Sequence, residues 1–250
     1  MAVKIISHRG ANRLAPQNTL PAFEAALKIG VDGFETDVHL TADGIPVICH
    51  NYKVNETSDG TGRISTMTYD EFKSYDFGGY FSPEFKGTTA PSLDEFLRLC
   101  LGADLEIINI ELKPSLENDM SVVSKTIQMV KDYGLSDKLL ISSFSSKMLL
   151  EAKKADKQCR TAYLYSPDKR EAHSVWHRAA EFAKEIGACA LHPNKCYVTK
   201  EYVKKAHNAG IAVNVWTVNK VKEMKKFIEM GVGGLITGCP DIAKSLIEQQ

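Results

Sequence analysis

The stretch GFETDVHLTADGIPVICH, residues 33–50, contains two strand-like runs separated by a short turn. In Gly33–Leu40, Phe34, Thr36 and Val38 alternate with polar residues, and Pro46–His50 is mostly apolar; both patterns are typical of strands. The segment between them includes Asp43 and Gly44, which is typical of a turn, and it is far shorter than the dozen or more residues of a crossover between parallel strands. We therefore predict an antiparallel hairpin in which His50 returns beside Glu35.

Apolar runs of strand length recur along the chain, with amphipathic helical patterns between most of them. The runs are Val3–Ser7, Gly33–Leu40, Pro46–His50, Glu106–Leu112, Leu139–Phe144, Thr161–Tyr165, Ala188–Leu191, Ile211–Val218 and Gly233–Thr237. The helical patterns include Thr19–Ile29, Asp119–Tyr133, Ser145–Ala155, Val175–Ile186, Lys200–Asn208 and Val221–Met230. Alternation of strand and helix indicates a parallel sheet with helices outside it. When the second arm of the hairpin is set aside, eight parallel strands remain, which predicts an α/β fold, a TIM (β/α)8 barrel forming a single domain over residues 1–250.

Residues 52–91 interrupt this rhythm with turn-forming residues and many aromatic side chains. We predict a small insertion that follows the hairpin arm. Aromatic side chains at this density need a surface to pack on, and an insertion at the active end of a barrel commonly shapes the substrate pocket. The alternative, that the insertion only covers the barrel mouth or seals an interface, stays open.

The composition is that of a soluble globular protein, with 44% hydrophobic and 25% charged residues. No segment approaches the ~20 apolar residues of a membrane span. Equal numbers of basic and acidic residues, 31 of each, leave no global positive field that would attract nucleic acid. The first strand begins at Val3, which leaves no room for a signal peptide, and the six cysteines show no paired spacing, so we expect a cytoplasmic protein.

Acidic residues mark two neighbouring strands. Glu35 and Asp37 are two residues apart, so their side chains point to the same face, and Glu111 with Lys113 repeats this spacing on the next parallel strand. Three carboxylates that meet at one edge are hard oxygen ligands, which favour Mg2+, Ca2+ or Mn2+. We predict a divalent metal site at Glu35, Asp37 and Glu111, with Lys113 as a phosphate contact. Each pair alone also fits a solvated strand end, and a buried Lys113 could form a Schiff base, although the nearby carboxylates would keep it protonated.

Two histidines complete the predicted site. His8 closes the first strand and is followed by Arg9, while His50 ends the hairpin arm. Cleavage of a phosphodiester needs one group to take a proton from the nucleophile and another to protonate the leaving alcohol, and imidazole suits both duties. His192, at a strand end, and Trp216, on the seventh parallel strand, are further candidates for the substrate pocket; Trp216 equally fits the core.

In this order, the motifs resemble those of the glycerophosphodiester phosphodiesterase family. The matching pieces are His8-Arg9-Gly10, Pro16-Gln17-Asn18-Thr19, Glu35-Thr36-Asp37-Val38, Thr41-Ala42-Asp43-Gly44-Ile45-Pro46-Val47, His50, Glu111-Leu112-Lys113 and Val215-Trp216-Thr217-Val218-Asn219. The resemblance implies a TIM barrel that hydrolyses glycerophosphodiesters to an alcohol and sn-glycerol 3-phosphate, in glycerol and lipid metabolism. It also implies a divalent cation at the three carboxylates, His8 and His50 as general acid and base, and phosphate binding by Arg9 and Lys113.

Two positions depart from the family pattern. Gln17 stands where the family usually has Glu, and Asn51 stands where Asp usually follows the second histidine. Both amides keep the shape and hydrogen-bonding reach of a carboxylate but remove a negative charge beside the site. These departures favour, as one alternative, a barrel that binds phosphodiesters with little turnover. A second alternative is a lysophospholipase D-like enzyme whose aromatic insertion holds an acyl chain.

Overall fold

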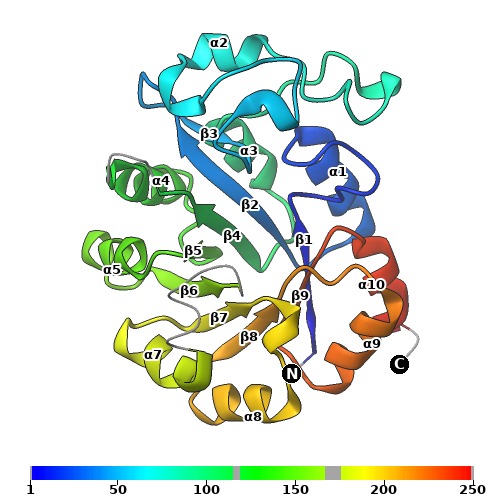
Figure 1. Cartoon of the computed structure of the whole chain (residues 1–250), viewed down its shortest axis with the longest axis vertical. Coiled ribbons are helices and arrows are strands. Elements are labelled where there is room, and N and C mark those ends of the chain that lie inside the picture. Colours follow the sequence, from blue (N-terminus) through cyan, green and yellow to red (C-terminus); the bar gives the residue numbers. More distant parts are fainter. Residues whose placement is uncertain (1, 115–118, 167–175, 249–250) are drawn as a thin grey trace.

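A closed parallel barrel organises the chain (Figure 1). The computed structural model describes residues 2–114, 119–166 and 176–248. In these residues the strands follow the sheet order β1-β9-β8-β7-β6-β5-β4-β2-β3, and an added pairing of β1 with β2 closes eight parallel strands into a barrel. The strands are β1 Lys4–His8, β2 Gly33–Leu40, β3 Pro46–Ile48, β4 Ile107–Leu112, β5 Leu139–Ser143, β6 Arg160–Tyr165, β7 Ala190–Pro193, β8 Ala212–Val215 and β9 Gly234–Thr237. The predicted TIM barrel is confirmed.

Helices lie outside the strands, as Figure 1 shows. The α-helices are α1 Leu20–Ile29, α2 Tyr69–Ser74, α3 Leu93–Cys100, α4 Ser121–Asp132, α5 Ser146–Ala155, α7 Ala179–Glu185, α8 Lys200–Asn208, α9 Val221–Glu229 and α10 Pro240–Glu248. All six predicted helical patterns form helices, although Val175, which opens one of them, lies outside the described residues. Among the described residues, no helix is long and apolar enough to cross a membrane.

The hairpin forms as predicted and sets the position of His50. Strand β3 pairs antiparallel with the end of β2, with Val38 opposite Ile48. One step further, the backbone N–H of Cys49 donates to the carbonyl oxygen of Asp37 at 3.1 Å. This register brings His50 just past Asp37, and His50 lines the same cavity as Glu35.

Alternation along β2 separates packing from chemistry. Phe34 points outward and packs against Phe23 of α1 and Phe96 of α3, with ring centroids 4.8–5.8 Å apart within this trio. Glu35 and Asp37 take the opposite face, toward the barrel interior, because successive side chains of a strand alternate between its two sides. Because Phe34 is buried against α1 and α3, the opposite face of β2 holds Glu35 and Asp37 at the mouth of the barrel.

The insertion has a small core of its own. Buried apolar side chains from β3 and from the insertion form a cluster: Val47, Cys49, Val54, Ile64, Met67, Phe72, Phe77 and Ala90. The insertion rejoins the barrel beside β3, where the N–H of Ile48 donates to the carbonyl oxygen of Pro91 at 2.9 Å. A capping box of Ser92 and Glu95 then starts α3. Phe72 and Phe77, with Tyr69 and Tyr75 packed against the cluster, thus serve the insertion's own packing.

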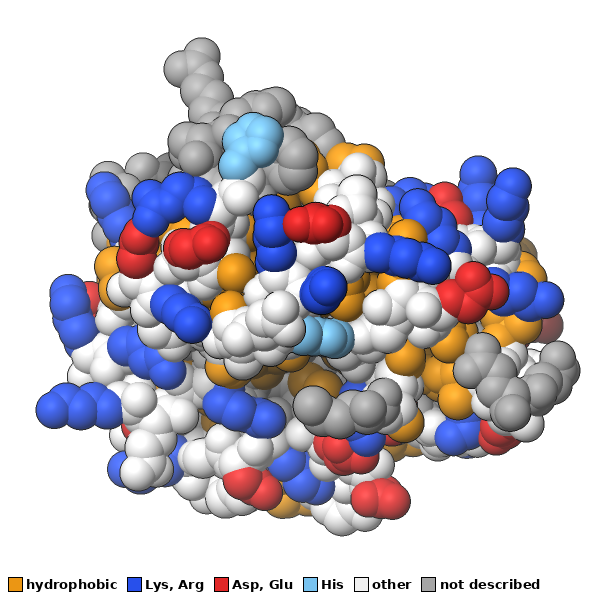
Figure 2. All heavy atoms as spheres, turned by 90° about the horizontal axis from the view of Figure 1, so that it is seen from below, with side chains coloured by type: hydrophobic (Ala, Val, Ile, Leu, Met, Phe, Trp, Pro, Cys, Tyr) orange, Lys and Arg blue, Asp and Glu red, His pale blue; other side chains and the backbone are white. Residues whose placement is uncertain are grey.

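The surface carries mixed charge. On the face that includes α8, Lys and Arg side chains are interspersed with Asp and Glu (Figure 2). This distribution matches the equal numbers of acidic and basic residues in the chain. The anion-binding groups of the predicted site are therefore a local feature of the barrel mouth.

His192 lies inside the barrel and does not line the cavity. Its side chain is fully buried, and its Nε2 faces the side-chain amide of Asn214 at 3.0 Å. Burial lowers the pKa of His192 to about 3. The sequence placed His192 among the candidates for the substrate pocket, but it is not among the residues that line the cavity, because its side chain is buried against Asn214 of β8.

We predict that His192 makes the fold sensitive to acid. Between pH 6.5 and about 3 the unfolded chain binds a proton at His192 that the folded chain excludes, so the free energy of unfolding falls as pH falls. In a His192→Gln variant, which keeps an acceptor for Asn214, this fall should be shallower by up to about 1.4 kcal/mol per pH unit. Urea unfolding curves from pH 7.5 to 4.5 measure it; parallel pH profiles for the two proteins would contradict the prediction.

Candidate active site

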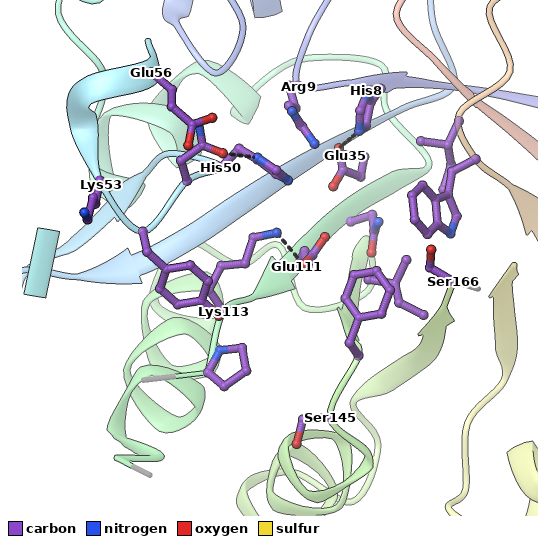
Figure 3. Close-up of a pocket in the computed structure, with 18 of the residues that line it drawn as sticks. His8, Arg9, Glu35, His50, Lys53, Glu56, Glu111, Lys113, Ser145 and Ser166 are labelled. Carbon is purple, nitrogen blue, oxygen red and sulfur yellow. Dashed lines mark hydrogen bonds and ion pairs between the residues drawn. The ribbon is translucent and has the colours of Figure 1, made fainter. Parts of the chain in front are cut away.

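A cavity of about 1020 Å3 opens at the carboxyl ends of the strands. Figure 3 shows its lining, to which β1, β2, β4 and the segment after β3 contribute charged side chains. The lining residues are His8, Arg9, Glu35, His50, Asn51, Tyr52, Lys53, Glu56, Arg63, Asn109, Glu111, Lys113, Pro114, Phe144, Ser145, Leu164, Ser166, Trp216 and Ile236.

Three buried carboxylates meet in the barrel mouth. One oxygen of each of Glu35, Asp37 and Glu111 lies within 4.8 Å of the others. The strand register explains this proximity, because Asp37 of β2 is directly beside Glu111 of β4 in the parallel ladder. Burial, together with the neighbouring charge of Asp37, raises the pKa of Glu35 well above its usual value. Burial also raises the pKa of Glu111. The positive charge around the cluster is therefore too small to balance the three carboxylates.

Two cations offset part of that charge. Lys113 Nζ lies 2.9 Å from Asp37 Oδ1 and also bonds Glu111, while Arg9 Nε lies 3.4 Å from Asp37 Oδ2. Although burial opposes ionisation of Asp37, Lys113 and Arg9 hold its pKa well below the usual range. The pKa of Lys113 is raised in turn, because the attraction of Asp37 and Glu111 outweighs its burial. A lysine held in this way stays protonated, which argues against a Schiff-base role.

The loop after β1 is shaped to aim Arg9 into the cavity. Arg9 adopts a positive φ of 57°, and its N–H donates to the carbonyl oxygen of Glu35 at 2.8 Å. Gly10 follows at φ 78°, where a Cβ would come within 2.6 Å of the backbone of Ala22, so only glycine fits. The guanidinium donates to Gln17 Oε1 at 2.7 Å. Gln17 thus supplies the acceptor that orients Arg9.

Asn18 anchors the same loop to the acidic strand. It also has a positive φ, 57°, and its amide bridges two side chains of β2. Asn18 Nδ2 donates to Asp37 Oδ2 at 2.9 Å, and Thr36 donates to Asn18 Oδ1, also at 2.9 Å. The motif Gln17-Asn18 therefore positions both a cation and a carboxylate of the cluster.

The two predicted histidines both reach the cavity (Figure 3). His8 Nε2 lies 3.9 Å from Glu35 Oε2. Burial and the charge of Arg9 lower the pKa of His8 well below its usual value, and burial lowers the pKa of His50 to about 4. Each imidazole is therefore neutral at neutral pH and able to accept a proton.

An apolar wall faces the charged cluster. Trp216 lines the cavity, and its ring meets that of Phe144 edge-on at 5.7 Å. The indole Nε1 donates to the carbonyl oxygen of His192 at 2.7 Å, which fixes the ring. Trp216 thus has the position predicted for it, while His192 supports it only through the backbone.

Sequence reasoning missed several lining residues. Asn109 is fully buried beside Glu35 in the ladder, and neither atom of its amide group has a hydrogen-bond partner among the described residues. Its spacing of two before Glu111 was the available signal. Lys53, Glu56 and Arg63 come from the insertion, where an irregular backbone gives no periodic signal. An isolated bridge pairs Lys53 with Arg63, and a short 3-10 helix, Val54–Glu56, carries Glu56.

We predict that Lys113 stabilises the folded chain. Replacing it in Lys113→Met leaves Asp37 and Glu111 buried without their main cation, which should lower the free energy of unfolding by about 3–5 kcal/mol at pH 7. Urea unfolding in the presence of a chelator measures the change. The matched control is Lys205→Met, which breaks an exposed pair with Glu201 and should change it by less than about 1 kcal/mol. Equal losses in the two variants would refute the prediction.

The fold and the site together define a class: a TIM barrel with a cluster of carboxylates and two neighbouring cations at the barrel mouth. The model of the glycerophosphoryl diester phosphodiesterase family matches residues 8–242, so the chain belongs to that family of phosphoric diester hydrolases. This match confirms the resemblance drawn from the sequence motifs.

Individual relatives agree over the full length. The chain is 34% identical to a glycerophosphodiester phosphodiesterase of Bacillus altitudinis, over 98% of each protein. It is 32% identical to one of Caldanaerobacter subterraneus, over 100% of this chain and 99% of the relative. A solved phosphodiesterase of Oleispira antarctica, in complex with the product sn-glycerol-3-phosphate, superposes with a TM-score of 0.90 at 28% identity, covering 99% of this chain and 97% of that one.

Proposed function

We propose that this protein is a metal-dependent phosphodiesterase that hydrolyses glycerophosphodiesters to an alcohol and sn-glycerol 3-phosphate. The observation that carries the proposal is a cluster of three buried carboxylates beside two cations and two imidazoles. All of these residues line one cavity except Asp37, which lies buried behind Arg9 and Lys113. Membership of the family and the product bound by the Oleispira antarctica relative support this substrate class.

The carboxylate cluster fits a divalent cation. Glu35 Oε2 is buried and has no hydrogen-bond partner among the described residues, and the pKa values of Glu35 and Glu111 are raised by burial. With all groups ionised, three carboxylates against Arg9 and Lys113 leave one excess negative charge. Glu35, Asp37 and Glu111 would hold Mg2+ or Ca2+, with Mn2+ as a further possibility, through hard oxygen ligands. Such an ion supplies Lewis-acid stabilisation of charge on the phosphoryl oxygens.

The protein's own side chains would bind the phosphate and move the protons. Arg9 offers a guanidinium for the phosphate oxygens, and Lys113 adds a second positive charge. His8 and His50 act as the acid–base pair: one removes a proton from the attacking hydroxyl and the other protonates the leaving alcohol. A bound phosphodiester brings negative charge, which raises the pKa of whichever imidazole must donate.

The two family departures are compatible with turnover. Gln17 accepts a hydrogen bond from Arg9 at 2.7 Å, and Asn51 Oδ1 lies 2.6 Å from His50 Nδ1. In both places the amide oxygen can accept a hydrogen bond, from Arg9 or from His50, as a carboxylate oxygen would. This arrangement favours a catalytic barrel over one that only binds its ligand.

We predict that turnover needs both the cation and His50. Chelation should abolish hydrolysis of glycerophosphocholine, and added Mg2+, Ca2+ or Mn2+ should restore it. Replacing His50 by Ala should lower kcat by at least about 100-fold, because an acid–base group is lost. His207→Ala, on the exposed face of α8, is the control and should leave kcat unchanged. Chelator-resistant hydrolysis, or an unimpaired His50→Ala variant, would sink the proposal.

On the side formed by the insertion, the cavity favours a small polar head group over an acyl chain. Within the insertion, the residues that line it are Tyr52, Lys53, Glu56 and Arg63, three of them charged. The insertion's buried aromatic side chains, Phe72 and Phe77, pack in its own core and leave no apolar tunnel of insertion residues. The lysophospholipase D-like alternative therefore has less support.

We predict a kcat/KM at least about tenfold higher for glycerophosphocholine than for lysophosphatidylcholine, because an acyl chain held by the insertion would lie against Lys53, Glu56 and Arg63. Initial rates of choline release, measured with both substrates as monomers in solution, give the ratio. A preference for lysophosphatidylcholine would contradict this prediction and favour the lysophospholipase D-like alternative.

We also propose that residues 1–250 act as one barrel domain, with residues 52–91 as an insertion, in the cytoplasm. All six cysteines are free thiols, which suits a reducing compartment. The partner of the site is the small-molecule glycerophosphodiester itself.

A further inference from the structure

A hydrogen-bonded chain links His50 to a glutamate of the insertion. His50 Nδ1 lies 2.6 Å from Asn51 Oδ1, and Asn51 Nδ2 donates to Glu56 Oε2 at 2.8 Å. In Figure 3 Glu56 stands on the side of His50 opposite to Glu35, so it is not part of the acidic cluster. The amide of Asn51 thus lies between the imidazole of His50 and the carboxylate of Glu56.

The donors and acceptors fix the direction of this chain. An ionised carboxylate can only accept hydrogen bonds, so the Asn51 amide must turn its NH2 group toward Glu56. Its oxygen then faces His50 and can only accept. Nδ1 of His50 must therefore carry the proton, which leaves the lone pair on Nε2.

The backbone around the chain is held by packing. Val54 is fully buried in the core of the insertion, and its N–H donates to the carbonyl oxygen of Gly62 at 3.1 Å. His39 Nε2 lies 3.3 Å from the carbonyl oxygen of His50, which secures the other end of the segment. The short 3-10 helix Val54–Glu56 therefore presents Glu56 to Asn51 from a fixed position.

We propose that Glu56 is a positioning residue which, acting through Asn51, holds His50 as the Nδ1-protonated tautomer and keeps its Nε2 free to accept a proton in the cavity. The catalytic consequence rests on the proposed function, whereas the tautomer itself is a property of the free protein. This assigns the insertion a part in catalysis without contact with substrate.

The tautomer can be measured directly. Two-bond 1H–15N correlation spectra of protein with 15N-labelled histidine rings distinguish Nδ1–H from Nε2–H, and the His50→Ala variant identifies the signals of His50. At neutral pH, where burial keeps His50 neutral, wild-type protein should show the Nδ1–H form. In Glu56→Gln the new amide can donate or accept, so Asn51 is free to flip and the Nε2–H form should appear.

Kinetics supply the second readout. In Glu56→Gln we expect kcat for glycerophosphocholine to fall about fivefold to tenfold with little change in KM, since a charged acceptor is replaced by a neutral one. The double variant Asn51→Asp/Glu56→Gln places a carboxylate directly against Nδ1 and should restore both the tautomer and kcat. Glu84→Gln, an exposed glutamate elsewhere in the insertion, should alter neither.

The outcomes separate this inference from the proposed function. An Nε2–H tautomer in wild-type protein, or an unchanged Nδ1–H tautomer in Glu56→Gln, would overturn the positioning role even if the protein hydrolyses glycerophosphodiesters. A tautomer shift in Glu56→Gln that the double variant reverses would support it, even if wild-type protein proved inactive.

Discussion

The ion pair between Lys113 and Asp37 holds the barrel mouth together. It joins the end of β4 to β2 across the parallel ladder, where Asp37 and Glu111 lie side by side and Glu35 is two residue pairs below them. Without a cation, burial of these groups would drive protons onto them, as the raised pKa values of Glu35 and Glu111 already indicate. The remaining excess of negative charge is what makes the cluster a fit for a divalent ion.

Neighbouring loops are organised around this pair. Arg9 and Asn18, both in a left-handed backbone conformation, each contact Asp37, so the loop after β1 is tied to the acidic strand. Gln17 then fixes the guanidinium from its other side. The positive φ angles of Arg9 and Asn18 are stabilised by the partners of their side chains: Asp37 contacts both residues, and Gln17 bonds Arg9. Such backbone conformations are often found at functional sites.

The insertion contributes more than a cover. Its core is separate from the helix–barrel core and is anchored on β3 through Val47. This core holds the segment from Asn51 to Glu56 beside the end of the hairpin, where Asn51 bonds Glu56. Of the two interpretations that the sequence left open for the insertion, the geometry favours a part in shaping the cavity.

Local patterns in the sequence sufficed for the strands, the hairpin and the inward carboxylates, because side-chain alternation and turn length are properties of a few consecutive residues. The barrel itself followed from counting strands, and the roles proposed for Glu35, Asp37, Glu111, His8 and His50 rest on side-chain alternation and on the order of the motifs. Only the tertiary structure revealed that His192 is buried outside the cavity lining, that Asn109 lines the cavity, and that Glu56 bonds Asn51. These facts depend on how far a strand extends past its neighbours and on how an irregular loop packs. Both are set by contacts between distant residues, which leave no period in the sequence.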